Sequence, residues 1–163
     1  MGIRMTLFIG VFAVVLSAAR VASADKAVLG YLENALIYPG AFPMEAKLDT
    51  GADNSSIHAH IARRWKKGGI TWVSFTIENK AGATLRLEKP VKRTVRVRQH
   101  SGDADKRVVV LLELCVGTVR RTVQVNLVDR DVFRYKLLVG RSFLANHIVV
   151  DPSLKFTFAP NCG

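Results

Sequence analysis

Short segments in which apolar and polar residues alternate make up most of the sequence after residue 25. The clearest is Thr94-Val95-Arg96-Val97-Arg98, where period-two alternation and β-branched residues indicate a strand with one buried face. Turn-forming residues separate such segments, for example at 79–82, 100–105 and 116–118. The strands predicted in this way are Ala27–Leu32, Met44–Asp49, Thr71–Glu78, Thr84–Lys89, Val91–Arg98, Arg107–Val116, Arg120–Asp129, Lys136–Val139, Ile148–Val150 and Lys155–Phe158.

Helical signals are few. The segment Arg141–Asn146, which follows Gly140, is the fair candidate for a short helix, and 57–67 is a second candidate for a turn or two. No internal repeat, heptad pattern or low-complexity tract is present. The pattern therefore predicts an all-β, single-domain barrel or sandwich.

The N-terminal segment has the features of a secretory signal. Arg4 provides a basic start, residues 7–16 are apolar, and Ala22-Ser23-Ala24 fits a cleavage site of small residues. The apolar run is too short to span a bilayer comfortably, although an uncleaved anchor is the alternative. We expect residues 1–24 to be a signal peptide, cleaved after Ala24, and residues 25–163 to be one domain in the periplasm or otherwise exported.

The chain is basic, with 24 Lys and Arg residues against 13 Asp and Glu. Without Arg4 and Arg20 of the signal segment the balance is 22 − 13, a formal charge of +9. This surplus favours anionic partners, but the basic residues are dispersed, as on the solvated faces of strands. We expect no nucleic-acid partner for an exported chain, and proximity to a membrane stays open.

The two cysteines, Cys115 and Cys162, leave two interpretations open. In an exported protein they could form a disulfide, or Cys115 could be a buried thiol within its apolar strand. Neither has the CxxC spacing of a metal site.

Candidate chemistry begins at Leu48-Asp49-Thr50-Gly51-Ala52, which places a carboxylate where an apolar strand ends. Gly51 allows close approach of the backbone, and the Thr50 hydroxyl can donate and accept a hydrogen bond. One carboxylate is a weak catalyst of amide hydrolysis, whereas two that share a proton can act as base and acid. The sequence contains one Asp-Thr-Gly, so a symmetric homodimer would supply the second acid.

These residues resemble the active-site signature of retropepsins, the single-lobed aspartic peptidases that work as homodimers. The segment Leu137-Leu138-Val139-Gly140-Arg141 is similar to the apolar-apolar-Gly-Arg segment of that family. More closely, the runs DTGADNSSIHA, NLVDRDVFRYKLLVGRSFL and VVDPSLKF resemble bacterial retropepsin-like proteins, often labelled "ATP-dependent zinc protease". The resemblance covers nearly all of the chain after residue 25. It implies a closed or partly open acid-protease β-barrel with one short helix after the Gly-Arg segment.

The resemblance also implies roles for individual residues. Asp49 is the catalytic carboxylate, paired with Asp49 of a second copy; Thr50 would interlock with its mate across the two-fold axis, and Gly51 would give an N–H to the carboxylate. Gly140 and Arg141 would support the loop and the interface. Ala52 lacks the hydroxyl that two-lobed relatives often carry there, so one hydrogen bond to the ionised acid is lost and we expect activity nearer neutral pH.

Retropepsins close a flap over the substrate, and the hairpin from Val91 to Arg107 is the candidate here. Its tip contains His100, Ser101 and Gly102. The C-terminal segment 148–158 is expected to pair with its mate at a dimer interface, with variation because Pro152 interrupts the strand.

Other chemistries have weaker signals. His58 and His60 form an H-x-H that could be a metal pair on one strand face, but no HExxH is present, so surface or structural histidines are the default. No phosphate-binding GxxxxGK[ST] loop is present either. We therefore expect no metal and no cofactor. The predicted function is an exported aspartic endopeptidase acting on proteins or peptides; the alternatives are a non-catalytic binding or adaptor module of the cell envelope that retains the Asp49 loop structurally and, more weakly, a metal-dependent hydrolase.

Overall fold

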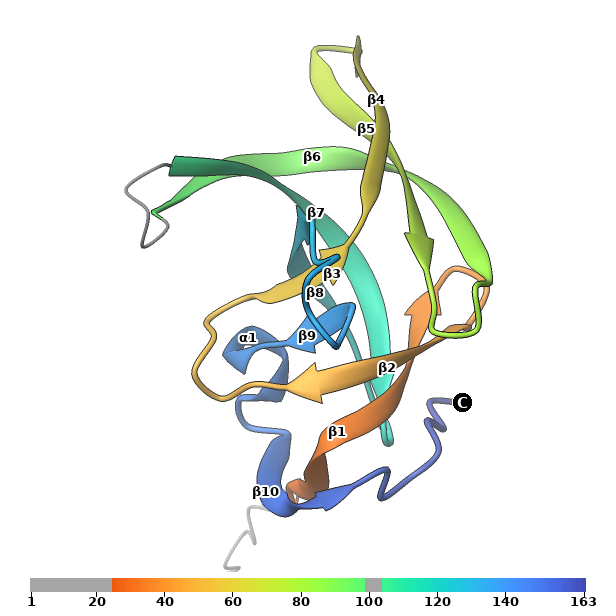
Figure 1. Cartoon of the computed structure of the whole chain (residues 1–163), viewed down its shortest axis with the longest axis vertical. Coiled ribbons are helices and arrows are strands. Elements are labelled where there is room, and N and C mark those ends of the chain that lie inside the picture. Colours follow the sequence, from red (N-terminus) through yellow and green to blue (C-terminus); the bar gives the residue numbers. More distant parts are fainter. Residues whose placement is uncertain (1–24, 99–103) are drawn as a thin grey trace, which may run out of the picture.

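The computed structural model describes residues 25–98 and 104–163, which form ten strands and one short helix (Figure 1). The prediction of an all-β chain with a short helix is confirmed. The elements are β1 (Ala27–Tyr38), β2 (Phe42–Leu48), β3 (Ser55–His58), β4 (His60–Lys67), β5 (Ile70–Glu78), β6 (Thr84–Arg98), β7 (Ala104–Val116), β8 (Val119–Val128), β9 (Leu137–Val139), α1 (Arg141–Leu144) and β10 (Ile148–Lys155).

Six of the strands close into a barrel. They follow one another in the order β1-β2-β9-β3-β8-β7, and β7 pairs back to β1 through the register Ala35↔Val116 to Tyr38↔Glu113. Closure pairs both edges of each barrel strand along part of its length, so few backbone groups are left without a partner. The apolar positions of these strands meet in one core, which includes Ile37, Ile57 and Phe143, all at 0% exposure.

Strand β6 connects the barrel to a smaller sheet because it changes partner midway. Its first half pairs with β5, from Thr84 to Pro90, and its second half pairs with β7, from Val91 to Arg98. Strand β4 completes the smaller sheet by pairing with β5. In Figure 1, β4 and β5 rise as a hairpin at one end of the molecule, and β6 and β7 extend as a second hairpin beside them.

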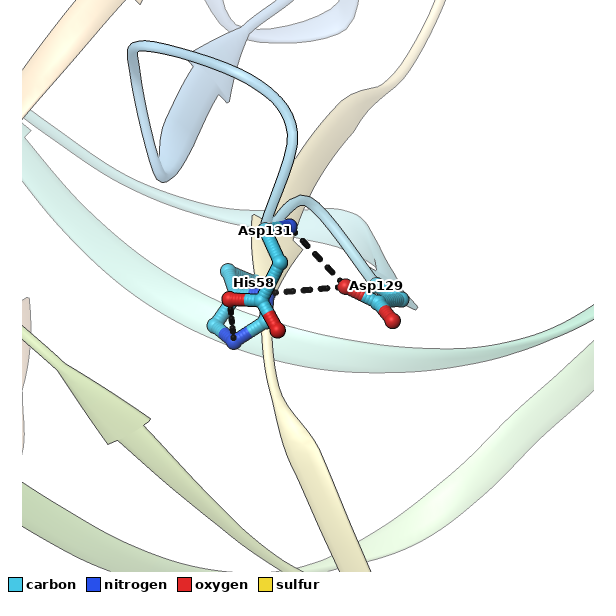
Figure 2. A group of neighbouring side chains, drawn as sticks. All are labelled: His58, Asp129 and Asp131. Carbon is cyan, nitrogen blue, oxygen red and sulfur yellow. Dashed lines mark hydrogen bonds and ion pairs between the residues drawn. The ribbon is translucent and has the colours of Figure 1, made fainter.

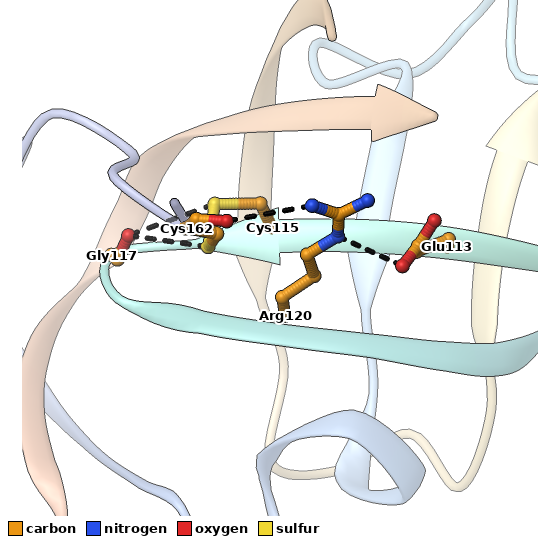
Figure 3. Close-up of a disulfide and its surroundings, with 5 residues drawn as sticks. All are labelled: Glu113, Cys115, Gly117, Arg120 and Cys162. Atoms are coloured by element: carbon orange, nitrogen blue, oxygen red, sulfur yellow. Dashed lines mark hydrogen bonds and ion pairs between the residues drawn. A yellow bond between two sulfur atoms is a disulfide. The ribbon is translucent and has the colours of Figure 1, made fainter. Parts of the chain in front are cut away.

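A disulfide and a buried carboxylate help to hold the C-terminal segment against the barrel. Cys115 on β7 and Cys162 form a disulfide across 47 residues of sequence, which settles the pairing that the sequence left open (Figure 3). The buried Glu33 carboxylate accepts hydrogen bonds from the Thr157 N–H at 2.9 Å and from the Thr157 hydroxyl at 2.6 Å. It also accepts a 2.7 Å bond from the N–H of Gly30 in its own strand, so this buried charge is satisfied.

Several details of the sequence prediction are wrong. Residues 57–67 are not helical but belong to β3 and β4. Pro152 lies within β10, where it does not end the strand but falls in a bulge between the partners Asp151↔Gly30 and Lys155↔Leu32. Strand β10 pairs in parallel with β1 of its own chain, whereas pairing with a second copy stays a prediction.

The helix α1 begins at Arg141, directly after β9, close to where the sequence predicted it. Two of its four residues, Phe143 and Leu144, are buried against the barrel. Arg121 of β8 donates a 2.6 Å hydrogen bond to the Phe143 carbonyl near the end of the helix. Within residues 25–98 and 104–163, no helix has the length and hydrophobicity needed to span a bilayer.

Candidate active site

Strand register brings together the two sequence segments of the candidate site. Strands β2 and β9 are parallel neighbours with Leu48 opposite Val139, so the residues that follow both strands leave the sheet at the same end. The Asp49 N–H donates a 2.9 Å hydrogen bond to the Val139 carbonyl. Asp49 and Gly140, which are 91 residues apart in sequence, therefore begin two adjacent loops.

The Asp49 carboxylate is held by its own loop and stays accessible. Its Oδ1 accepts a hydrogen bond of 2.9 Å from the N–H of Gly51, and the Ala52 N–H reaches the Asp49 carbonyl at 3.3 Å. Its Oδ2 lies 3.8 Å from the Lys47 ammonium, and the Asp49 side chain is 27% exposed. Thr50 and Gly51 are exposed beside it. The loop thus presents one oriented carboxylate to the outside of the protomer.

Arg141 makes three contacts with the loop that follows Asp49. Its backbone N–H donates to the Ala52 carbonyl at 2.8 Å, and its guanidinium Nη1 donates to the Thr50 carbonyl at 3.0 Å. The same guanidinium forms an ion pair with the carboxylate of Asp53. A planar fork of donors can hold a carbonyl and a carboxylate at once, which suits arginine better than lysine.

Gly140 lies directly against the backbone of the same loop. A Cβ at this position would stand 2.7 Å from the carbonyl carbon and oxygen of Asn54 and 2.8 Å from the Ala52 carbonyl oxygen. The Gly140 N–H donates to the buried Ser55 hydroxyl at 3.2 Å. The absence of a side chain therefore lets the loop and the segment after β9 pass in backbone contact.

The candidate flap is only partly described. The hairpin of β6 and β7 is paired from Val91↔Val110 to Arg98↔Ala104. Its tip, with His100, Ser101 and Gly102, lies outside the described residues. The hairpin is therefore shown, and its role as a flap stays a prediction.

The two histidines of the H-x-H motif lie away from Asp49, in a cluster with two aspartates. His58 is 3% exposed, and its ring nitrogens lie 3.6 Å from Asp129 Oδ1 and 3.4 Å from Asp131 Oδ1 (Figure 2). His58 Nε2 lies 3.1 Å from His60 Nε2. Of the described residues, His58, Asp129 and Asp131 are the group close enough to share a metal ion.

The hydrogen bonding of His58 argues against a metal there. Its Nδ1 accepts a 2.8 Å bond from the backbone N–H of Arg130, so the proton of the neutral ring sits on Nε2. Burial, followed by the nearby Lys136 ammonium, lowers the pKa of His58 below its ordinary value and favours this neutral form. A metal ion needs a free lone pair on a ring nitrogen. Here the lone pair of Nδ1 accepts the Arg130 N–H, and Nε2 carries the ring proton. The cluster does not fit a metal site as it stands.

A cavity of about 420 Å³ adjoins these histidines. Its walls include Tyr31, Tyr135 and Phe156, but Asp49 is not part of its lining. The cavity and the Asp49 loop are therefore separate features.

Comparison with known proteins is consistent with this geometry. The RimB-like family, described as "Retropepsin-like aspartic endopeptidase RimB", matches residues 28–161. The chain belongs to this family. The retropepsin-like fold predicted from Asp49 and the Gly140-Arg141 segment is thereby confirmed.

Relatives of this RimB-like chain include longer proteins. It is 35% identical over 120 residues to a "Probable alpha-L-glutamate ligase" of Shewanella pealeana, covering 72% of this chain and 26% of the relative. It is 30% identical over 112 residues to a protein of the same name from Parasynechococcus marenigrum, covering 67% and 24%. The chain thus spans about a quarter of the length of these curated relatives.

A solved structure is also similar. The crystal structure of Lpg0085, a protein of unknown function from Legionella pneumophila subsp. pneumophila str. Philadelphia 1, has a TM-score of 0.70 and 37% sequence identity. The similarity covers 82% of this chain and 98% of that chain. The fold of the RimB-like domain therefore extends over nearly all of a separately solved protein.

Sequence reasoning missed three residues that the structure places at the Asp49 loop. They are Lys47 beside the carboxylate, Asp53 as the ion-pair partner of Arg141, and Ser55 as the acceptor for the Gly140 N–H. Asp53 and Ser55 stand within the DTGADNSS run, but nothing in the sequence shows that they face residues 140–141. Lys47 had one available signal, because residues two apart on a strand share a face.

Proposed function

We propose that this RimB-like chain is an aspartic endopeptidase whose active site combines Asp49 from two copies. The observation that carries the proposal is the Asp49 carboxylate itself. It is 27% exposed and is oriented by a hydrogen bond from the Gly51 N–H. Its loop is held in place by backbone contact with Gly140 and by the hydrogen bond from Arg141 to the Thr50 carbonyl. An oriented but accessible acid is what a shared two-carboxylate site requires.

The proposed reaction needs two carboxylates and one proton between them. The ionised acid takes a proton from a water molecule as that water attacks the scissile carbonyl carbon. The protonated acid gives its proton to the carbonyl oxygen, which yields a tetrahedral gem-diol intermediate. The acid that took the water proton then protonates the nitrogen, the C–N bond breaks, and the other carboxylate takes a proton from a hydroxyl of the intermediate as the carboxylic acid product forms. The two carboxylates end the reaction as they began it, with one proton between them, and none of these transfers requires a cofactor.

A homodimer would supply the second Asp49. Thr50 and Gly51 are exposed next to the acid, where a two-fold axis would bring the two loops together. Strand β10 is an edge of the described sheet. It and the residues after it expose apolar side chains, namely Val149, Leu154, Phe156 and Phe158. These exposed side chains support a contact between copies at the C-terminal segment.

For the substrate we propose acidic peptides, in particular peptides that contain glutamate. Without Arg4 and Arg20 of the signal segment the chain carries a formal charge of 22 − 13, or +9, which attracts anionic substrates. Its relatives named as probable alpha-L-glutamate ligases point to the same amino acid. We further propose that the domain acts after export and removal of residues 1–24, which the disulfide supports because such bonds persist in oxidising compartments.

The second candidate function is a binding module without catalysis. It is favoured by the relatives named as ligases, in which a segment similar to this chain makes up about a quarter of the length. The contacts of the Asp49 loop with Gly140 and Arg141 would then serve the fold alone.

Two substitutions separate these functions. Asp49→Asn keeps the shape of the side chain but removes the acid, and Asp129→Asn removes an exposed acid from the histidine cluster. Both are compared with the unaltered protein on casein and on glutamate-rich peptides, with and without a pepstatin-type inhibitor or a chelator. We expect cleavage that is lost in Asp49→Asn and retained in Asp129→Asn and with chelator. Cleavage that survives Asp49→Asn but not chelator would show a metal enzyme, and peptide binding without cleavage would show a binding module.

A further inference from the structure

The hairpin of β4 and β5 extends away from the barrel (Figure 1). Its outer strand, β4, is an edge of the sheet and pairs with β5 alone among the described strands. Seven of its eight residues are exposed and Trp65 is half-buried. The outward N–H and C=O groups of such a strand can pair with a further strand.

Strand β4 is also the most basic segment of the hairpin. It carries Arg63, Arg64, Lys66 and Lys67, none of which forms an ion pair with a described residue. The one acidic residue between positions 60 and 78 is Glu78, at the far end of β5. The four positive charges are therefore not neutralised within the described structure.

Two tryptophans stiffen the hairpin. Trp65 on β4 and Trp72 on β5 are directly paired, and their rings stack with centroids 6.3 Å apart and planes 23° apart. The Arg63 guanidinium lies 4.5 Å from the centre of the Trp65 ring. Cross-strand aromatic pairs and cation–π contacts of this kind stabilise a projecting hairpin that two strands alone would hold poorly. The basic edge is thus a preformed surface.

The positive charges occupy both faces of β4. Side chains alternate along a strand, so Arg63 and Lys67 share the face of Trp65, whereas Arg64 and Lys66 point to the opposite face. A flat anionic surface such as a bilayer would meet one of these faces. An added strand whose successive residues are acidic would place carboxylates beside both.

From this arrangement we propose that the β4 edge binds an extended acidic polypeptide by strand addition. Backbone hydrogen bonds would supply the pairing, and the four cations would select acidic side chains on both faces. The same charge keeps copies of this chain from pairing edge to edge, because two basic strands repel each other. The proposal concerns a surface separate from the Asp49 loop, and it does not depend on the peptidase activity proposed above.

The protein carries its own reporter for this surface. Its two tryptophans are Trp65 and Trp72, so intrinsic tryptophan fluorescence reports on the hairpin alone. The full-length Asp49→Asn protein is titrated at low salt with an eight-residue all-glutamate peptide, which matches the length of β4. We expect a saturable fluorescence change that weakens as salt rises, and no such change with an all-lysine peptide.

Three double variants test the two faces. Arg63→Gln/Lys67→Gln and Arg64→Gln/Lys66→Gln each remove two charges from one face of β4. Lys26→Gln/Lys155→Gln removes two charges from exposed positions next to the start of β1 and at the end of β10. Figure 1 shows these two strands at the opposite end of the molecule from the hairpin of β4 and β5. We expect each hairpin variant to bind the acidic peptide about 2- to 30-fold more weakly, as the loss of two exposed ion pairs implies, and the control to bind normally.

Two further probes separate strand addition from its alternatives. A glutamate peptide N-methylated at four consecutive central residues keeps its charge but loses backbone donors, and we expect it to bind at least about tenfold more weakly. Vesicles of anionic lipid are tested for co-sedimentation in parallel. The proposal is wrong if the methylated peptide binds equally well, if the control variant weakens binding as much as the hairpin variants, or if vesicles bind through the hairpin while the peptide does not.

Discussion

Replacing Gly140 by alanine tests whether the segment after β9 holds the Asp49 loop in place. The new Cβ would stand 2.7 Å from the Asn54 backbone, which is 0.7 Å short of the 3.4 Å at which ordinary contact begins. The neighbouring atoms are backbone, so no flexible side chain can move aside. Gly140 has φ −96°, which alanine adopts freely, so the clash and not backbone strain decides the effect.

We expect this clash to affect both stability and catalysis. Overpacking of this kind costs about 1–3 kcal/mol in the free energy of unfolding. A shift of the Asp49 loop by a large part of an ångström is expected to lower kcat by about 10- to 100-fold. Urea denaturation measures the first quantity, and the rate of peptide cleavage per folded protein measures the second.

Gly117→Ala is the matched control for this experiment. Gly117 lies in the turn between β7 and β8 with φ +58°, so alanine there is strained and also loses stability. Gly117 lies against Leu29, and its carbonyl accepts a hydrogen bond from the Asn161 N–H, so its contacts are with other residues than those of the Asp49 loop. We therefore expect kcat per folded protein to stay unchanged. If Gly140→Ala has the stability and the kcat of the unaltered protein, the close backbone contact does not support the site and the reasoning is wrong.

Three other predictions follow from the structure. Because burial lowers the pKa of His58, the unfolded chain binds a proton that the folded chain excludes. The free energy of unfolding is therefore not reduced by His58 above pH 6.5, the ordinary pKa of histidine. As the pH falls below 6.5, the free energy of unfolding decreases by up to about 1.4 kcal/mol per pH unit until the pH passes the pKa of His58 in the folded protein. Urea denaturation across this range should show that slope, and His58→Asn should lack it. Reduction of the Cys115–Cys162 disulfide should lower the free energy of unfolding by about 4 kcal/mol on the chain-entropy model, and Cys162→Ser should no longer respond to reductant. Arg141→Lys should lower kcat about tenfold or more, because a lysine ammonium cannot bind the Thr50 carbonyl and the Asp53 carboxylate as the planar guanidinium does. The free energy of unfolding should fall by less than about 1 kcal/mol. An unchanged kcat would show that Arg141 does not position the Asp49 loop.

Much of the fold could be predicted because most strands have one buried and one exposed face. Where that contrast is missing, the prediction was wrong. All four residues of β3 are buried and nearly all of β4 is exposed, so neither shows a period of two. The predicted strand ends at Leu32 because Glu33 interrupts the apolar pattern. The observed β1 continues to Tyr38, and Glu33 is buried within it with its carboxylate hydrogen-bonded to Thr157.

The other differences between the sequence prediction and the structure arise from pairing between segments that are far apart in the sequence. The sequence predicts separate strands at Thr84–Lys89 and Val91–Arg98, yet β6 runs through Pro90 because the strand changes partner there from β5 to β7. The candidate site followed from a resemblance between short motifs, which named Asp49 and Arg141 but not their contacts. The ion pair between Arg141 and Asp53 depends on the parallel register of β2 and β9, which no local pattern contains.

Mixing active and inactive subunits tests the central claim most directly. A fixed amount of the unaltered protein is allowed to exchange subunits with increasing amounts of Asp49→Asn, and peptide cleavage is measured. If each site needs Asp49 from two copies, mixed dimers are inactive; cleavage then falls to about one half at an equal amount of the variant and to about one tenth at a ninefold excess. Cleavage that stays constant at every ratio, in mixtures shown to contain mixed dimers, would contradict the shared site.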